Sequence, residues 1–255
     1  MQEPLRPQAF SPAAGGPASS FGASPRQESA KNNLYVRVDY FDWRESEFSI
    51  RLLEETGPLV NLGYLRRTDA ARFRAEFFGG AIHYDGATWD GEPITATSDY
   101  LGFRVQYDLL VPLACDPHTA FTLGLGTRLW NRNLHDGQTI LGDPVYGYDE
   151  TWWSVYPVVG LETRRPLGAT TELVASATLG WTGFTYQWIS EFDASLYPKM
   201  GPMAQAEIGL QGPRLSIAAS IEWMQWYASG FSGTPQVYQP ESRMFTIGLS
   251  GGYRF

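Results

Sequence analysis

Apolar and polar residues alternate with a period of two along most of the chain after Asn33. Such alternation is typical of β-strands, whose successive side chains point to opposite faces. We count about ten segments of this kind, separated by residues that favour turns. Their approximate ranges are 33–46, 59–68, 71–85, 97–112, 119–133, 149–165, 170–187, 200–211, 214–229 and 241–255. The pattern predicts an all-β protein.

The connections between these segments alternate between short and long. The short ones include Thr68-Asp69-Ala70 and Gly212-Pro213, and the long ones cover roughly 47–58, 86–96, 134–148, 188–199 and 230–240. Membrane barrels have short turns at one end, longer loops at the other and an even number of strands. We therefore predict a transmembrane antiparallel up-and-down β-barrel of about ten strands over residues 33–255.

Alternation also assigns the two faces of each strand. In the segment 97–112, Leu101 and Phe103 share one face, whereas Arg104 and Asp108 share the other. The apolar set must face lipid, because an unsatisfied polar group in hydrocarbon costs free energy. The polar set is therefore expected to line the lumen.

Extending this assignment to every strand places a balanced set of charges inside the barrel. Ten strands enclose a narrow lumen, so opposite charges there are expected to pair and to plug it. A narrow polar pore is the alternative interpretation of the same residues. The predicted lumen network comprises Arg37, Asp39, Arg72, Arg74, Glu76, Arg104, Asp108, Arg128, Glu162, Arg164, Glu172, Glu207, Glu222 and Arg254.

Tryptophans concentrate near the end of the barrel that carries the long connections. Aromatic residues anchor membrane proteins at the lipid–water interface, which is one interpretation. An aromatic surface that binds a glycan, a lipid or a protein is the other, because inward positions cannot anchor in lipid. The predicted outer aromatic rim comprises Trp43, Trp130, Trp152, Trp153, Trp181, Trp188, Trp223 and Trp226, with Trp89 in a loop.

One residue conflicts with the strand prediction. Pro157 falls inside the segment 149–165, and proline cannot donate a hydrogen bond to a neighbouring strand. A closed barrel has no free edge, so we expect a β-bulge at this position or a shorter strand.

The composition of the chain limits the classes of ligand and partner that it is expected to bind. Aromatic residues make up 15% of the chain, charged residues 18%, and the net charge is −8. Phosphate backbones require a basic patch, so nucleic acid is disfavoured as a partner. The three histidines, His83, His118 and His135, are too far apart in the pattern to form a metal cluster, and we predict neither a metal nor a cofactor.

The final segment, Met244 to Phe255, is apolar on one face and ends in an aromatic residue. In this it resembles the last strand of bacterial outer-membrane β-barrels. The resemblance implies a place in a Gram-negative outer membrane with both termini periplasmic, and contact with outer-membrane lipid and lipopolysaccharide. It also implies that Phe255 is the signal read by the outer-membrane assembly machinery.

The resemblance extends to ten-stranded omptin proteases only in strand count and in the position of His83. The sequence contains no matching motif, and alternation points His83 towards lipid. An omptin-like or lipase-like hydrolase would need His83 or His135 within hydrogen-bond reach of an acid or a serine on a neighbouring strand. We expect no enzymatic activity and no catalytic residues.

Residues 1–32 are rich in Pro, Ala, Gly and Ser and carry almost no apolar periodicity. Such a segment cannot bury enough apolar surface to offset its chain entropy, so we predict a low-complexity periplasmic tail. The tail could reach a periplasmic or membrane protein partner. The functional hypothesis is a non-enzymatic structural, anchoring or binding platform, with a narrow solute pore as the alternative.

Overall fold

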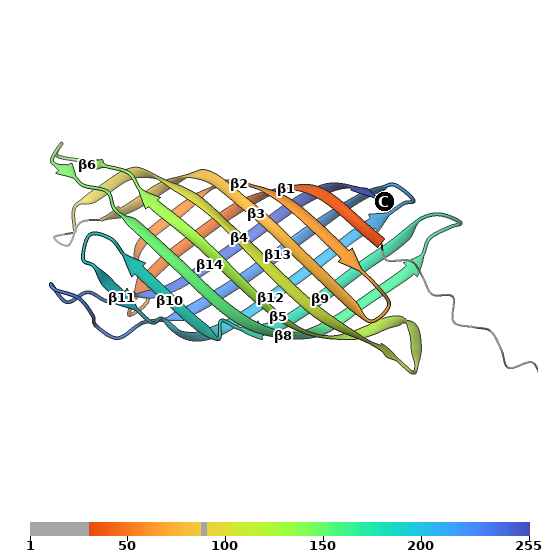
Figure 1. Cartoon of the computed structure of the whole chain (residues 1–255). Helices are drawn as coiled ribbons and strands as arrows, with labels where there is room; N and C mark the ends of the chain where they lie inside the picture. Colours follow the sequence, from red (N-terminus) through yellow and green to blue (C-terminus); the bar gives the residue numbers. More distant parts are fainter. Residues whose placement is uncertain (1–30, 88–90) are drawn as a thin grey trace, which may run out of the picture.

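The computed structural model describes residues 31–87 and 91–255, and this part of the chain forms one sheet of fourteen β-strands (Figure 1). Nowhere within those residues is there a helix with the length and apolar character needed to cross a membrane. The strands are β1 (Lys31–Glu47), β2 (Ile50–Arg67), β3 (Ala71–Ala87), β4 (Pro93–Leu113), β5 (Asp116–Leu134), β6 (Gly137–Thr139), β7 (Pro144–Val145), β8 (Asp149–Pro166), β9 (Glu172–Trp181), β10 (Phe184–Ile189), β11 (Ala194–Leu196), β12 (Lys199–Gln211), β13 (Leu215–Tyr227) and β14 (Glu241–Arg254).

The sheet closes on itself because its first and last strands pair. β1 and β14 are antiparallel, with Asn33 opposite Arg254 and Ser46 opposite Glu241. The wall contains ten antiparallel strands in the order β1, β2, β3, β4, β5, β8, β9, β12, β13 and β14. The predicted all-β, ten-stranded up-and-down barrel is thereby confirmed.

The two ends of the barrel differ. The terminal end carries Lys31, Phe255 and short turns such as Thr68–Ala70, and Phe255 stays paired there through its N–H, 3.0 Å from the Asn32 carbonyl. The opposite end, here called the loop end, carries the longer connections, including the β6–β7 hairpin that stands away from the wall in Figure 1. Chain direction alternates from strand to strand and the strand number is even, so Lys31 and Phe255 lie at the same end.

The long loop predicted over residues 47–58 is wrong. β1 and β2 instead continue to a two-residue turn at Phe48 and Ser49, which both have positive φ angles. The alternating sequence after Ile50 pairs with β1, apart from an irregularity at Leu52, and this pairing satisfies backbone groups that a loop would leave to water. β2 also tolerates Pro58, because its ladder with β3 is interrupted between Thr56 and Val60.

Pro157 lies within a full-length β8, and the expected bulge or shortening of that strand does not occur. The interruption is in the neighbouring strand. β10 pairs with β8 up to Val155, and β9 takes over at Val158, with Thr182 and Gly183 between them. Pro157 therefore faces a gap in the ladder, where its missing N–H costs no hydrogen bond.

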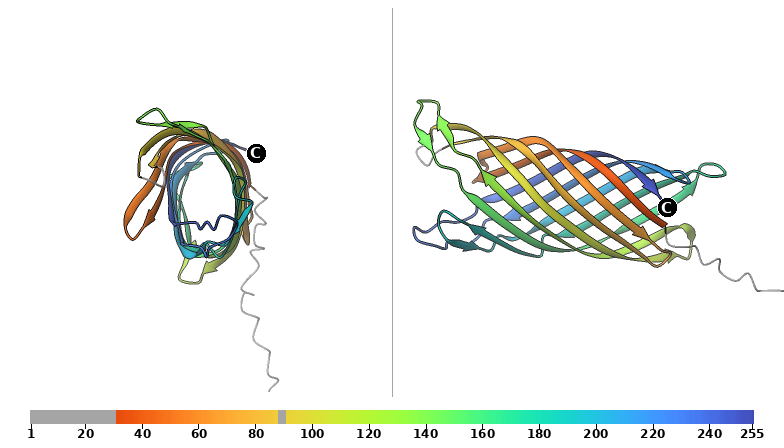
Figure 2. Two further views of the ribbon diagram at one scale, coloured as in Figure 1. Left: turned by 90° about the vertical axis from the view of Figure 1, so that its left-hand side faces the viewer. Right: turned by 45° about the horizontal axis from the view of Figure 1, so that its top comes forward.

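Apolar side chains cover the outside of the barrel and polar ones fill the inside. On β4, Leu101 and Phe103 are exposed on the outer face, whereas Arg104 and Asp108 are buried. This is the arrangement of a membrane-spanning barrel. The barrel is oval in cross-section (Figure 2), so opposite walls come close enough for long side chains to meet across the lumen.

Candidate functional site

The middle of the lumen is filled by a network of buried ion pairs. Arg37 NH1 lies 2.8 Å from Glu76 Oε1, and Arg37 Nε lies 2.9 Å from Asp39 Oδ1. Arg104 pairs with Glu76 and, at 2.8 Å, with Glu222. These residues come from β1, β3, β4 and β13, so the network ties the wall together from several directions.

Arg128 extends this network on β5. Its NH2 lies 2.5 Å from Glu222 Oε2, which also accepts from Arg104. Asn61 bridges Arg37 and Asp39 with hydrogen bonds of 3.1 and 2.9 Å. Three guanidinium groups thus face three carboxylates, and a paired buried charge costs far less free energy than an unpaired one.

A second group of charges lies towards the terminal end. Arg72 contacts Asp108 and Glu162, both at 2.9 Å, and Arg67 contacts Glu162 at 2.7 Å. Other pairs here are Arg74–Glu207 at 2.7 Å, Arg164–Glu172 at 2.5 Å and Lys31–Glu172 at 3.9 Å. Glu172 and Lys31 are more exposed than the others, so this layer opens to solvent at the barrel mouth.

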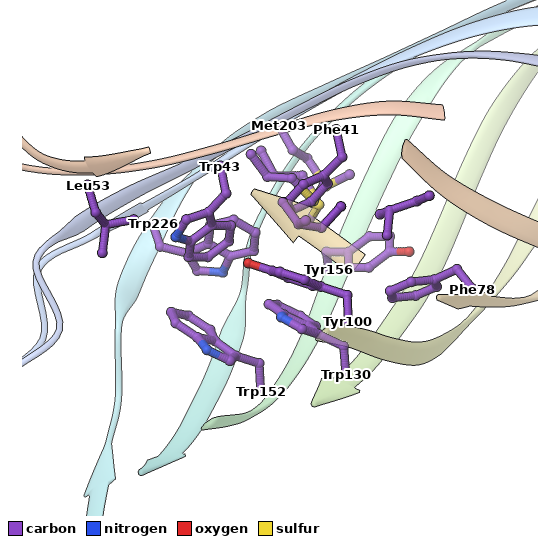
Figure 3. Close-up of a cluster of buried hydrophobic side chains, with 14 of the residues drawn as sticks. Phe41, Trp43, Leu53, Phe78, Tyr100, Trp130, Trp152, Tyr156, Met203 and Trp226 are labelled. Atoms are coloured by element: carbon purple, nitrogen blue, oxygen red, sulfur yellow. The ribbon is translucent and has the colours of Figure 1, made fainter. Parts of the chain in front are cut away.

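Above the ion pairs, on the side of the loop end, aromatic side chains close the lumen (Figure 3). Trp130 and Trp152 stack with ring centroids 5.3 Å apart, and Trp43 and Trp226 pack against them at 5.2–6.4 Å. All four side chains are at most 3% exposed. The same buried cluster also contains Phe41, Phe78, Tyr100, Tyr156, three methionines and several aliphatic residues.

Arg132 forms a further polar layer beyond the tryptophans. Its guanidinium lies 2.9 Å from Glu55, 3.1 Å from Glu45 and 2.9 Å from Glu150, and all four groups are buried. Trp43 and Trp152 link this layer to the aromatic cluster, because their indole N–H groups donate to Glu45 and Glu150 at 3.0 and 2.9 Å.

The spaces left between these layers are small. Three cavities inside the lumen measure about 20, 20 and 30 Å³, and each is lined by residues of the ion-pair or aromatic layers. A cavity of this size holds about one water molecule. At the level of these layers, side chains therefore occupy most of the lumen, whereas a cavity of about 430 Å³ opens at the terminal mouth beside Lys31, Glu172 and Arg254.

Every residue of the predicted lumen network points inward. Nine of them are buried: Arg37, Asp39, Arg72, Glu76, Arg104, Asp108, Arg128, Glu162 and Glu222. The other five are partly exposed and lie near the terminal end or beside it: Arg74, Arg164, Glu172, Glu207 and Arg254. The structure joins thirteen of them into the two groups of ion pairs described above, and Arg254 donates a hydrogen bond to the Gly212 carbonyl at the terminal end.

Sequence reasoning missed the polar layer at Arg132. Its members share a parity with residues that alternation had already placed inside: Glu45 follows Arg37 and Asp39 at even spacing, and Arg132 follows Arg128. The signal was therefore present. It was overlooked because Glu55 lay in the segment predicted as a loop, and Glu45, Arg132 and Glu150 lay at the ends of predicted strands.

The interface-anchoring interpretation of the outer aromatic rim is wrong for four of its eight tryptophans. Trp43, Trp130, Trp152 and Trp226 lie in the lumen, where they pack against one another. Alternation agrees with this inward placement, since Trp43 alternates in step with Asp39 and Trp130 with Arg128. They act as a buried core of the barrel and cannot anchor it in lipid.

The remaining rim tryptophans point outward near the loop end. Trp153 is 44% and Trp181 is 56% exposed, and Trp188 and Trp223 are partly exposed. Phe184 packs against Trp153 at a ring distance of 5.5 Å. Aromatic side chains in such positions are typical of the lipid–water interface. Trp89 lies outside the described residues.

The histidines are exposed, and among the described residues no group of three or more His, Cys, Asp or Glu side chains is arranged to hold a metal ion. His135 Nε2 lies 3.0 Å from Asp99 Oδ2, so one histidine does reach an acid on a neighbouring strand. Both side chains are about half exposed on the outer face of the wall, away from the lumen.

At the loop end, Tyr238 donates a hydrogen bond to Glu47 at the end of β1. Burial and this contact raise the pKa of Tyr238 to about 12, so its hydroxyl remains a donor at neutral pH. The bond ties the loop between β13 and β14 to the β1–β2 hairpin. This hydrogen bond therefore holds two connections at the loop end to each other.

No protein-family model and no curated protein matches the sequence. Among solved structures, the outer-membrane protease OmpT from Escherichia coli is 9% identical, with a TM-score of 0.49 over 90% of this chain and 98% of that one. The β-domain of the Bordetella autotransporter BrkA is 13% identical, with a TM-score of 0.44 over 89% and 100%. OprG from Pseudomonas aeruginosa is 8% identical, with a TM-score of 0.39 over 89% and 95%. Similarity at this level concerns the barrel architecture and carries no argument about function.

Proposed function

We propose that this protein is a non-conducting outer-membrane barrel that serves as a structural or binding platform, with the terminal end in the periplasm. The observation that carries the proposal is the closed lumen. Ion pairs, four tryptophans and the Arg132 layer follow one another along the barrel axis, and the cavities between them hold about one water each.

Binding would then fall to surfaces outside the lumen. The apolar wall contacts outer-membrane lipid, and the longer connections at the loop end face lipopolysaccharide and the exterior. Phe255 is exposed at the terminal end, as a residue read by the assembly machinery must be. The tail was predicted over residues 1–32. Residues 31 and 32 belong to β1, and the rest lies outside the described part of the chain. A periplasmic partner of the tail is part of this proposal.

Single-channel conductance of the refolded protein in planar bilayers tests the proposal. We expect a silent bilayer from protein whose folding is verified by its heat-modifiable migration on gels, both for the full chain and after removal of residues 1–30. Discrete conductance steps from the full chain would instead establish the narrow pore. Steps seen only after removal would make residues 1–30 part of the closure.

The contact between His135 and Asp99 favours a hydrolase as the second candidate, because a general base needs an acid to orient it. The pair lies on the outer face of the wall near the loop end, so its substrate would be a lipopolysaccharide or a lipid. Activity against lipid esters that disappears in His135→Ala would establish it, provided that the variant still shows the heat-modifiable migration of the folded barrel on gels. Equal activity of the two proteins would exclude this pair.

A further inference from the structure

At the loop end, the connection between β13 and β14 turns inward over the opening of the barrel. This connection covers residues 228–240 and is here called the strap. In the end view of Figure 2 the strap crosses the lower part of the opening. Two of its side chains are buried, with Val237 6% and Gln239 2% exposed. The strap is therefore packed against the inside of the barrel mouth.

Gln239 joins the strap to the wall close to the Arg132 layer. Its Oε1 accepts a hydrogen bond of 2.7 Å from Gln187 of β10, and its Nε2 donates one of 2.8 Å to Ser242 of β14. Ser242 lies opposite Glu45 in the ladder between β14 and β1. The amide of Gln239 thus lies beside the Glu45 carboxyl, and the strap covers that part of the layer.

The Arg132 layer carries more negative than positive charge. Among residues 31–87 and 91–255, the carboxylates of Glu45, Glu55 and Glu150 each form an ion pair with Arg132 alone. The network in the middle of the lumen differs, because three guanidinium groups there face three carboxylates. All three carboxylates of the Arg132 layer are buried, at 6%, 0% and 3% exposure. Burying such an excess of charge is costly, and a carboxylate in this situation is neutralised by taking up a proton.

Glu45 and Glu150 compete for the same donor. Glu45 Oε1 and Glu150 Oε2 accept from one nitrogen of Arg132, NH1, at 3.1 and 2.9 Å. The two oxygens therefore lie within about 6 Å of each other, where one negative charge disfavours the other. Burial raises the pKa of Glu45; Arg132 opposes this effect, and Glu150 adds to it.

The other groups around the pair do not supply the missing positive charge. Glu55 of β2 accepts from Ser98 and from Tyr100 of β4 and lies 2.9 Å from Arg132 Nε, so it uses part of the guanidinium itself. Burial raises the pKa of Tyr84 on β3 to about 12 and that of Tyr148, before β8, well above its usual value, so both stay neutral.

This level of the barrel lies beyond the lipid-covered wall. The outward positions beside the layer carry charged side chains: Arg44 on β1, Glu54 on β2 and Asp149 on β8. Hydrocarbon would not cover such residues. Water at the loop end can therefore reach the layer wherever the strap leaves the mouth open.

We propose that Glu45 and Glu150 form a pH-dependent latch for the strap: the pair carries a proton at neutral pH, and loss of this proton at alkaline pH releases the strap from the mouth. Two ionised carboxylates are hydrated only when the strap lifts and admits water, so ionisation and release are thermodynamically linked. The four tryptophans lie below the latch and keep the lumen closed in both states. The latch thus goes beyond the proposed function and does not depend on it.

A spin label on the strap tests the latch by electron paramagnetic resonance. The label is attached at Gln236→Cys, an exposed strap position, in full-length protein that carries Cys115→Ser and is refolded in lipid vesicles. We expect an ordered label at acidic and neutral pH. At alkaline pH the ratio of mobile to ordered label should rise about tenfold per pH unit, as the loss of one proton requires.

Two substitutions remove the shared proton independently. Glu45→Gln and Glu150→Gln each keep an oxygen that accepts from the neighbouring indole N–H, of Trp43 or Trp152, but leave one ionised carboxylate in the pair. Either variant should therefore keep the label ordered at every pH, and the second serves if the first does not refold.

Glu54→Gln is the matched control, because it makes the same chemical change at the same end of the barrel. Glu54 pairs with Arg44 at 2.8 Å on the outer face, so this variant should show the transition of the unaltered chain. A label that is mobile at every pH, a label that stays ordered at alkaline pH in the unaltered chain, or a transition that persists in both Glu45→Gln and Glu150→Gln would each overturn the proposal. Conductance, which tests the proposed function, is measured separately and is expected to stay absent at every pH.

Discussion

Arg104 and Glu222 form an ion pair across the lumen, with 2.8 Å between NH1 and Oε2 although 118 residues separate them in the chain. β4 and β13 are not neighbours in the wall, so this contact joins opposite sides of the barrel. Backbone hydrogen bonds hold each strand to the next, whereas contacts of this kind hold the cross-section in its oval shape. The lumen therefore supplies the tertiary specificity that an apolar core supplies in a soluble protein.

Replacing Arg104 should test this role. Arg104→Leu leaves Glu76 and Glu222 buried with one cation fewer, and breaking a buried pair in this way costs about 3–5 kcal/mol. Phe103→Leu, on the lipid-facing side of the same strand, should cost less than about 1.5 kcal/mol. Urea unfolding in lipid vesicles, followed by tryptophan fluorescence, gives both values. Equal losses for the two variants would contradict the assignment of faces.

Two glycines on β14 offer a second test within one strand. A Cβ added at Gly248 would overlap the carboxylate of Asp39, whereas one added at Gly251 would meet nothing within 4 Å. Gly248→Ala should therefore destabilise the barrel by displacing Asp39 from Arg37. Gly251→Ala should be neutral or stabilise by up to about 1 kcal/mol, because alanine restricts the unfolded chain. Unfolding midpoints that move together would show that the lumen tolerates displacement.

Much of this fold could be predicted from alternation because a barrel wall imposes a strict period of two. Strand number, closure and the inward position of Arg37 or Glu222 followed from that period alone. The ends of strands did not, since β1 and β2 extend past the lipid-facing zone into a region where both faces are polar. Arg132 was missed there, and the role of Trp43 stayed open between interface anchor and inward aromatic residue, because hydrophobicity no longer marks the outside.

The pairing partners themselves could not be predicted. Alternation predicts that Arg128 faces inward. It does not predict that Arg128 pairs with Glu222 of β13 instead of Glu76 of β3. That choice depends on strand tilt and on the oval cross-section, which arise from the register of all ten strands together. The gap opposite Pro157 was hidden for the same reason, as it lies in a neighbouring strand.

The aromatic closure should contribute as a packed core. Trp43→Ala removes a side chain that is 1% exposed and contacts three other tryptophans, so it should cost about 3–5 kcal/mol. Trp153→Ala, an outward tryptophan, leaves no internal cavity and should cost clearly less. The same urea titration compares them, and a larger loss for Trp153 would show that interface anchoring outweighs the closure.

The junction between β9 and β10 depends on one hydroxyl. Thr182 is fully buried; its Oγ1 accepts from the Gly201 N–H at 2.9 Å and donates to the Gln225 carbonyl at 2.9 Å. It therefore joins three strand segments where the ladder opposite Pro157 is broken. Thr182→Val keeps the shape but leaves both backbone groups unsatisfied, which should cost about 1–3 kcal/mol. Thr97→Val, at an exposed position of β4, should stay within about 0.5 kcal/mol. Hydrogen exchange should show faster exchange at Gly201 in Thr182→Val only. Unchanged protection there would mean that packing around the gap, and not the hydroxyl, holds the junction closed.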